Sequence, residues 1–137
     1  MSNPSQVAFL SRKVFGVAGA SVDVSKYGNR VLKFYKSHNR NVIPINPKEK
    51  TIEDLEVVKT VPELVEMANV KYHVEPSQIA LSIVTPPRVS EQILHDAAKA
   101  GIKQVWMQPG SEPANWQELS LTLGLDSVGG GPCVLMT

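Results

Sequence analysis

The feature that most constrains the fold is a short apolar run that leads through small residues into an amphipathic segment. Residues 14–18 read V-F-G-V-A, residues 19–21 read G-A-S, and Gly28 opens a stretch with Val31, Leu32 and Tyr35 at helical spacing. A buried strand, a tight turn and a helix in this order form the first half of a nucleotide-binding β-α-β unit. A turn of small residues lets a phosphate approach the backbone and the N–H groups of the helix start.

The glycine spacing leaves two interpretations of this stretch open. Gly16 lies inside the expected strand, and the gap from Gly19 to Gly28 is longer than the compact G-x-G-x-x-G fingerprint allows. The small residues could therefore serve only to let the helix pack closely on the strand. The order of strand, turn and helix favours nucleotide binding.

Strands and helices alternate along the rest of the chain. Further strands are expected at 41–45, 79–84, 104–107 and 125–128, with a short edge strand at 57–58. A helix or turn is expected from 61 to 68, helices from 89 to 100 and from 113 to 123, and a loop over 69–77. This alternation predicts an α/β fold, a Rossmann-like three-layer α/β/α domain with a mostly parallel sheet of about five strands in the order 3-2-1-4-5. Residues 1–137 should form one domain.

Composition excludes several classes of function. The chain is 42% hydrophobic and 20% charged, which is ordinary for a globular protein. Its net charge of +1 gives no basic footprint for nucleic acid, and no apolar run is long enough to span a bilayer. The first residues lack the features of a signal peptide, and a single cysteine, Cys133, cannot form an internal disulfide. We therefore expect a cytoplasmic protein in a reducing compartment.

Candidate ligand-binding residues follow the expected strands, because ligands of such sheets bind beyond the carboxyl ends of the strands. These segments are Gly19-Ala20-Ser21, Asn46-Pro47-Lys48, Thr85-Pro86-Pro87, Gln108-Pro109-Gly110 and Gly129 to Cys133. A classical NAD site places an acid after the second strand, whereas this chain places Lys48 there. Lys48 could pair with the 3′-phosphate of coenzyme A or the 2′-phosphate of NADP, or it could be a solvated surface lysine. Lys26 and Arg30 are further candidate phosphate partners.

Motifs in the right order resemble the CoA-binding proteins, stand-alone Rossmann-like domains similar to the N-terminal domain of the succinyl-CoA synthetase α subunit. The motifs are G-A-S, K-Y-G-N-R-V, N-V-I-P-I-N-P-K, V-T-P-P, V-W-M-Q-P-G and the terminal G-G-G-P-C, and they cover the chain from about Val14 to Cys133. Two features depart from the family. The synthetase's second domain, which carries the phosphorylated histidine, has no counterpart in these residues. Glycines and Pro132 precede Cys133, where bacterial members often have charged residues.

The resemblance also implies how CoA would lie along the chain. The turn Gly19, Ala20 and Ser21 and the helix start at Lys26, Tyr27 and Gly28 would hold the CoA phosphates. Pro47 and Lys48, next to Asn46, would border the adenosine and its 3′-phosphate. Thr85, Pro86 and Pro87 would lie along the nucleotide, and Gln108, Pro109 and Gly110 near the pantetheine arm.

Residues that could carry catalysis do not form a recognisable constellation in the sequence. His38, His73 and His95 fall on or beside helices and loops, and no spacing suits a catalytic triad or a metal. We therefore expect no catalytic centre and no metal. Cys133 has two interpretations: a small buried hydrophobe, or a thiol close to the CoA sulfur that can form a mixed disulfide.

The function that we predict is binding of CoA or acyl-CoA by a small domain without an evident catalytic centre. Two alternatives remain open at this point. One is a small NADP-dependent or acyl-CoA-handling enzyme. The other is a nucleotide-sensing regulatory subunit that docks on another protein, as part of a homo- or hetero-oligomer. Neither a nucleic acid nor a membrane is expected as a partner.

Overall fold

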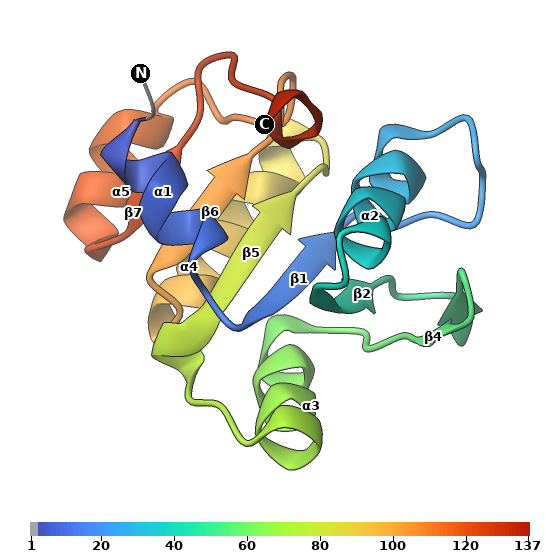
Figure 1. Cartoon of the computed structure of the whole chain (residues 1–137). Coiled ribbons are helices and arrows are strands. Elements are labelled where there is room, and N and C mark those ends of the chain that lie inside the picture. The colour runs from blue at the N-terminus through green and yellow to red at the C-terminus, as the bar shows by residue number, and fades with distance from the viewer. Residues whose placement is uncertain (1–2) are drawn as a thin grey trace.

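The computed structural model describes residues 3–137 and has the expected α/β architecture. Five parallel strands lie in the order β2-β1-β5-β6-β7: β1 (Val14–Ala18), β2 (Asn41–Ile45), β5 (Ile79–Ile83), β6 (Gln104–Met107) and β7 (Asp126–Val128). The helices are α1 (Pro4–Leu10), α2 (Tyr27–Ser37), α3 (Val61–Tyr72), α4 (Pro87–Ala100) and α5 (Trp116–Leu123), with 3-10 turns η1 (Pro76–Gln78) and η2 (Val134–Met136). A hairpin of β3 (Thr51–Ile52) and β4 (Leu55–Glu56) stands beside the sheet (Figure 1).

The sheet has a buried apolar layer on each face, which explains why β1 reads as an unbroken apolar run. Val14 and Ala18 pack with residues of α3 and α4, whereas Phe15 and Val17 pack with residues of α1 and α2. A Cβ on Gly16 would lie 2.7 Å from Leu64 Cδ2, so this glycine lets α3 lie close against β1. The three layers are therefore α1 and α2, the sheet, and α3 to α5.

The third strand, expected at residues 57–58, does not form. This segment nevertheless lies beside β2, as the predicted strand order requires. Val58 makes a single parallel bridge with Ile45 of β2, and Thr60 already caps α3 two residues later, so the chain has no length for a strand. The hairpin β3–β4 was missed because Glu53 and Asp54 turn with φ of 51° and 66°. Turns of this kind are usually signalled by asparagine and glycine, which this sequence lacks there.

Helix ends also differ from the prediction. Helix α3 continues through Tyr72, where a loop was expected, and ends at His73 with φ of 57°. A glycine normally marks such an end, and none is present here. Helix α4 begins at Pro87 rather than Val89, and α5 at Trp116 rather than Pro113.

Pro44 lies inside β2 without breaking the sheet, because β2 is the outermost of the five strands. The Pro44 carbonyl accepts a hydrogen bond from Val58 N–H at 3.0 Å, so the backbone of Pro44 faces outward, away from β1. The missing N–H of proline therefore removes no bond to β1.

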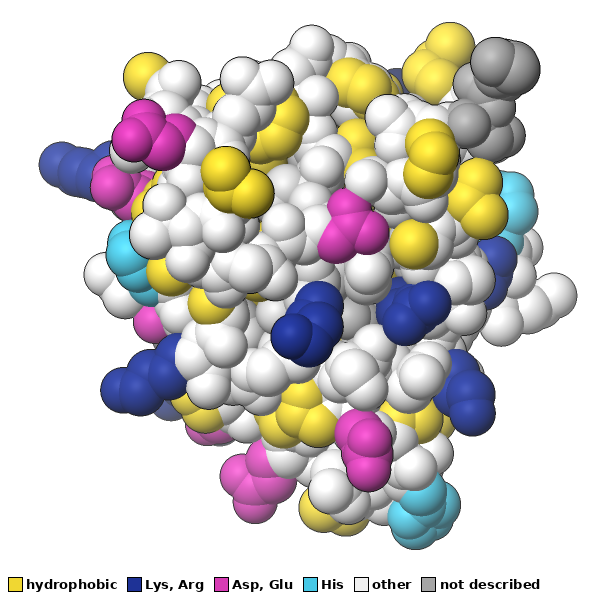
Figure 2. Space-filling view, turned by 90° about the vertical axis from the view of Figure 1, so that its left-hand side faces the viewer, with side chains coloured by type: hydrophobic (Ala, Val, Ile, Leu, Met, Phe, Trp, Pro, Cys, Tyr) yellow, Lys and Arg dark blue, Asp and Glu magenta, His cyan; other side chains and the backbone are white. Residues whose placement is uncertain are grey.

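On the face shown in Figure 2, basic and acidic side chains are interspersed among apolar ones. Within residues 3–137, no helix combines the length and the apolar character required to cross a membrane.

Candidate functional site

The loops that follow the parallel strands meet at the carboxyl edge of the sheet (Figure 1). Three helices, α2, α3 and α4, begin at this edge after β1, β2 and β5. Helix N-termini carry unpaired N–H groups and a partial positive charge. The edge is therefore suited to an anion.

The turn after β1 is shaped by two glycines that contact each other. Gly19 has a φ of 92°, and a Cβ there would lie 3.1 Å from the backbone carbon of Val84. A Cβ on Gly28 would lie 2.0 Å from the Gly19 carbonyl oxygen, so the first turn of α2 rests directly on this turn. A side chain at position 28 would push the helix start away from this turn, and one at position 19 would press against Val84 and Thr85 after β5.

Asn46 fastens the loop after β2 to the turn after β1. Its Nδ2 donates to the Ala20 carbonyl at 2.9 Å, and its Oδ1 accepts from the N–H groups of Lys48 and Glu49 at 2.7 and 3.0 Å. Pro47 and Lys48 are exposed residues of this loop. One asparagine thus sets the position of two segments that the sequence predicted to bind the ligand.

A cavity of about 280 Å³ opens between the starts of α3 and α4, beside the turn at Gly19. Its walls combine aliphatic side chains with hydroxyl, amide and charged groups: Ala18, Gly19, Ile45, Asn46, Pro47, Lys59, Thr60, Val61, Thr85, Val89, Gln92, Ile93 and Asp96. Such mixed linings, apolar with a few polar groups, are typical of small-molecule sites.

The helix starts beside the cavity are held by side-chain hydrogen bonds. Thr60 Oγ1 accepts from Glu63 N–H at 3.3 Å and so caps α3, and Glu63 Oε2 accepts from Lys59 N–H, one residue before the cap, at 2.9 Å. Ser90 Oγ donates to the Thr85 carbonyl at 3.0 Å and is 2.8 Å from Thr85 Oγ1. These bonds fix Thr60 and Thr85 on opposite sides of the cavity.

Tyr27, Gln108 and Cys133 form a second group, which lies with the C-terminal segment. Gln108 is fully buried, and its Oε1 accepts from Val134 N–H at 2.9 Å. The Tyr27 hydroxyl contacts the Cys133 thiol, which is half-buried. Burial, together with the hydrogen bond to Cys133, raises the pKa of Tyr27 above the usual value for a phenol.

The structure brings together part of the site predicted from the sequence. The cavity is lined by four of the predicted residues, Gly19, Asn46, Pro47 and Thr85. The adjoining turn and helix start contain three more, Ala20, Ser21 and Gly28. The remaining loops and helix starts at this edge expose Lys26, Lys48, Pro86, Pro87, Pro109 and Gly110. Of the histidines, His38 and His73 cap the C-terminal ends of α2 and α3, and His95 is exposed on α4. Among residues 3–137, no cluster of three or more metal-ligating side chains occurs.

Nine cavity residues were missed by the sequence reasoning: Lys59, Thr60, Val61, Val89, Gln92, Ile93 and Asp96, and the strand-end residues Ala18 and Ile45. The T-x-x-E pattern of Thr60 and Glu63 marks a helix start and could have pointed to the first three. Gln92 and Asp96 lie one helical turn apart and are joined by a 3.0 Å hydrogen bond, but only tertiary packing brings them to the cavity.

Comparisons with known proteins identify relatives of this fold. The family described as "CoA binding domain" matches residues 13–137. A conserved hypothetical protein from Pyrococcus furiosus is 32% identical, with a TM-score of 0.77 over 91% of this chain and 97% of that chain. Two further proteins share the fold. One is a hypothetical protein from Pyrococcus horikoshii OT3, with 21% identity and a TM-score of 0.78 over 96% of this chain and 85% of that chain. The other is a protein from Thermus thermophilus, with 20% identity and a TM-score of 0.76 over 96% of this chain and 91% of that chain. No curated protein matches.

Proposed function

The chain belongs to the CoA-binding domain family, and we propose that it binds coenzyme A or acyl-CoA at the carboxyl edge of its sheet. The observation that carries this proposal is the cavity between α3 and α4, which opens beside the turn that supports the first residues of α2. A nucleotide needs both parts: a pocket for the base and a backbone surface for the phosphates.

In this proposal the CoA phosphates lie against residues 19–21 and the start of α2. The contact of Gly28 with the Gly19 carbonyl supports it, because it brings the start of α2 directly against this turn. Helix N–H groups and the dipole of α2 favour an anion at this place. Lys26, at the N-cap of α2, adds a positive charge.

The adenosine occupies the cavity. Ile45, Val61, Val89 and Ile93 offer aliphatic surfaces to the purine ring, and Thr60 and Gln92 offer hydrogen-bonding groups to its edge. Lys48, on the exposed side of the loop that Asn46 holds, reaches the 3′-phosphate from outside the cavity.

The pantetheine arm leaves the phosphates toward the second group, with the Gln108 to Gly110 segment beside it and Cys133 near its thiol end. The contact between Tyr27, the first residue of α2, and Cys133 supports this direction, because it joins the phosphate end of the site to the C-terminal segment. A single cysteine suits the reducing cytoplasm in which we place this function.

Two measurements on the purified full chain test the proposal. Native mass spectrometry of the protein as purified should detect a bound species with the mass of CoA or an acyl-CoA. Calorimetric titration of the ligand-free protein with CoA and with acetyl-CoA should give one site per chain. If CoA and acetyl-CoA both fail to bind, and a different nucleotide co-purifies, the proposal is wrong.

A further inference from the structure

Helix α3 carries apolar side chains on its outer side as well as in the core. Val61, Leu64 and Ala68 are buried between the helix and the sheet. On the outer side, Met67 is half-buried and Val70 is 72% exposed. The outer face of α3 thus presents one half-buried and one exposed apolar side chain among charged ones.

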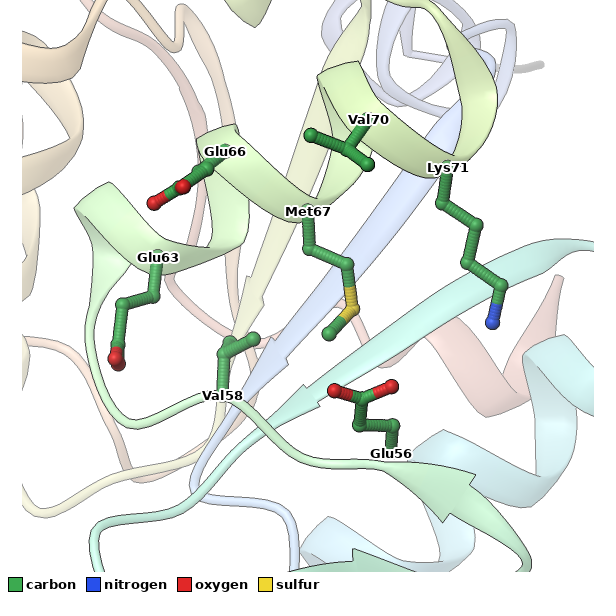
Figure 3. A pocket seen from close by; sticks show the side chains of 7 residues that line it. All are labelled: Glu56, Val58, Glu63, Glu66, Met67, Val70 and Lys71. Atoms are coloured by element: carbon green, nitrogen blue, oxygen red, sulfur yellow. The ribbon is translucent and has the colours of Figure 1, made fainter.

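A groove of about 490 Å³ runs between this face and the segment from Glu56 to Val58 (Figure 3). Val58 and Met67 lie inside it, Val70 stands at its border, and Glu56, Glu63, Glu66 and Lys71 surround it. None of its lining residues lines the proposed CoA cavity. Three carboxylates against one lysine also make this groove unsuitable for a phosphorylated ligand.

The five helical residues of the groove form one stripe along α3. Glu63, Glu66, Met67, Val70 and Lys71 follow the spacing i, i+3, i+4, i+7 and i+8, which places them on one face. Their charges are ordered along it, with the acids toward the N-terminus and the lysine toward the C-terminus. Both Glu63 and Glu66 are exposed, and Glu63 already accepts a hydrogen bond from Lys59 N–H.

This stripe is complementary to itself when two copies run antiparallel. The midpoint between Glu66 and Lys71 lies between residues 68 and 69 of the helix, and so does the midpoint between Met67 and Val70. A two-fold axis through that midpoint therefore places Met67 of one copy against Val70 of the other, and at the same time Glu66 against Lys71. Each contact occurs twice, as in any isologous interface.

We propose that the outer face of α3 is the interface of a homodimer, with two antiparallel α3 helices packed across a two-fold axis. Val70 of each copy enters the groove of the other and covers Met67, and the Glu66–Lys71 pairs flank this apolar centre. The core of the interface is one 12-residue helix from each chain. An interface of this size is small, so the dimer should dissociate in roughly the micromolar range.

Sedimentation equilibrium of the full chain over a range of concentrations tests the proposal. The wild type should show a monomer–dimer equilibrium. Val70→Glu should raise the dimer dissociation constant at least about tenfold, because it places a charge in the apolar centre. Leu121→Glu is the matched control, since Leu121 is 83% exposed on α5 and should leave the equilibrium unchanged. A wild type that stays monomeric at millimolar concentration, or a Val70→Glu variant that dimerises like the wild type, would overturn the proposal.

A charge-swap experiment tests the antiparallel arrangement itself. Glu66→Lys and Lys71→Glu should each weaken self-association, because each variant places like charges opposite one another. An equimolar mixture of the two variants should form a heterodimer, since both ends then pair a lysine with a glutamate. Circular dichroism would verify that each variant is folded. If the mixture associates no more tightly than either variant alone, the antiparallel pairing is wrong.

Discussion

Lys48 is the residue whose contribution to the proposed CoA site can be isolated most cleanly. It is exposed, its backbone N–H is held by Asn46 at 2.7 Å, and its side chain is free to turn toward a ribose phosphate. A charge-assisted hydrogen bond contributes roughly 1.5–3 kcal/mol when partly shielded and less in open solvent. Lys48→Ala should therefore lower the affinity for CoA about tenfold, which corresponds to about 1.4 kcal/mol of binding free energy.

The same substitution should leave dephospho-CoA almost unaffected, because that ligand lacks the 3′-phosphate. Calorimetry of both ligands on both proteins gives the coupling between lysine and phosphate. Lys50→Ala, which removes another exposed lysine of the same loop, is the control and should change neither affinity. If Lys48→Ala lowers the affinity for CoA and for dephospho-CoA by the same factor, Lys48 does not recognise the 3′-phosphate.

Cys133 provides a second test at the residue scale, this time of the direction of the pantetheine arm. If the arm ends beside Cys133, the thiolate can attack the disulfide of oxidised CoA, forming a Cys133–CoA disulfide and releasing one CoA thiol. Intact-mass measurement should show a single adduct that dithiothreitol removes and that is absent from Cys133→Ser. Absence of the adduct on folded protein that binds CoA would instead favour the interpretation of Cys133 as a packing residue.

Among the elements, the contact between α2 and the turn after β1 is the one on which the proposed phosphate site depends. Gly28→Ala places a methyl carbon 2.0 Å from the Gly19 carbonyl oxygen, so helix and turn must separate. Overpacking of this kind costs about 1–3 kcal/mol or more. Denaturant unfolding should show this loss, and calorimetry should show that CoA affinity falls at least about tenfold.

Gly124→Ala is the control for that experiment. Gly124 ends α5 with a φ of 71°, and a Cβ there has no neighbour within 4 Å among the described residues. Its left-handed backbone makes alanine unfavourable by roughly 1–2 kcal/mol, without a clash. Gly124→Ala should thus lose stability and keep CoA affinity. An affinity that falls equally in both variants would mean that stability, and not the turn, governs binding.

The elements also show what the sequence could and could not predict. The strands of the parallel sheet were predictable because unbroken apolar runs such as 14–18 are typical of strands buried on both faces. The end of α3 and the β3–β4 turn were not, because His73, Glu53 and Asp54 adopt positive φ without glycine. The turn at Gly19 was visible in the sequence, whereas the cavity wall at Gln92 and Asp96 depends on how α4 packs beside α3.

At the scale of the whole molecule, the proposed CoA site and the proposed dimer interface adjoin at α3 and at the segment before it. Lys59, Thr60 and Val61 line the cavity, whereas Val58 and the outer stripe of α3 line the groove. Since the two sets of residues are distinct, Val70→Glu should leave the affinity for CoA unchanged while it weakens the dimer. Titration of CoA into this variant checks that independence. A matched loss of affinity would indicate that dimerisation and ligand binding are coupled.

The measurement that tests CoA binding most directly is thermal unfolding of the full chain with CoA and, separately, with NAD. A ligand that binds only the folded state stabilises it by about 2.7 kcal/mol at ~100 times its dissociation constant. We predict that CoA raises the unfolding temperature in a concentration-dependent way and that NAD does not, because the loop after β2 carries Lys48 where an NAD site requires an acid. Equal shifts with CoA and NAD, or a shift with NAD alone, would contradict the account.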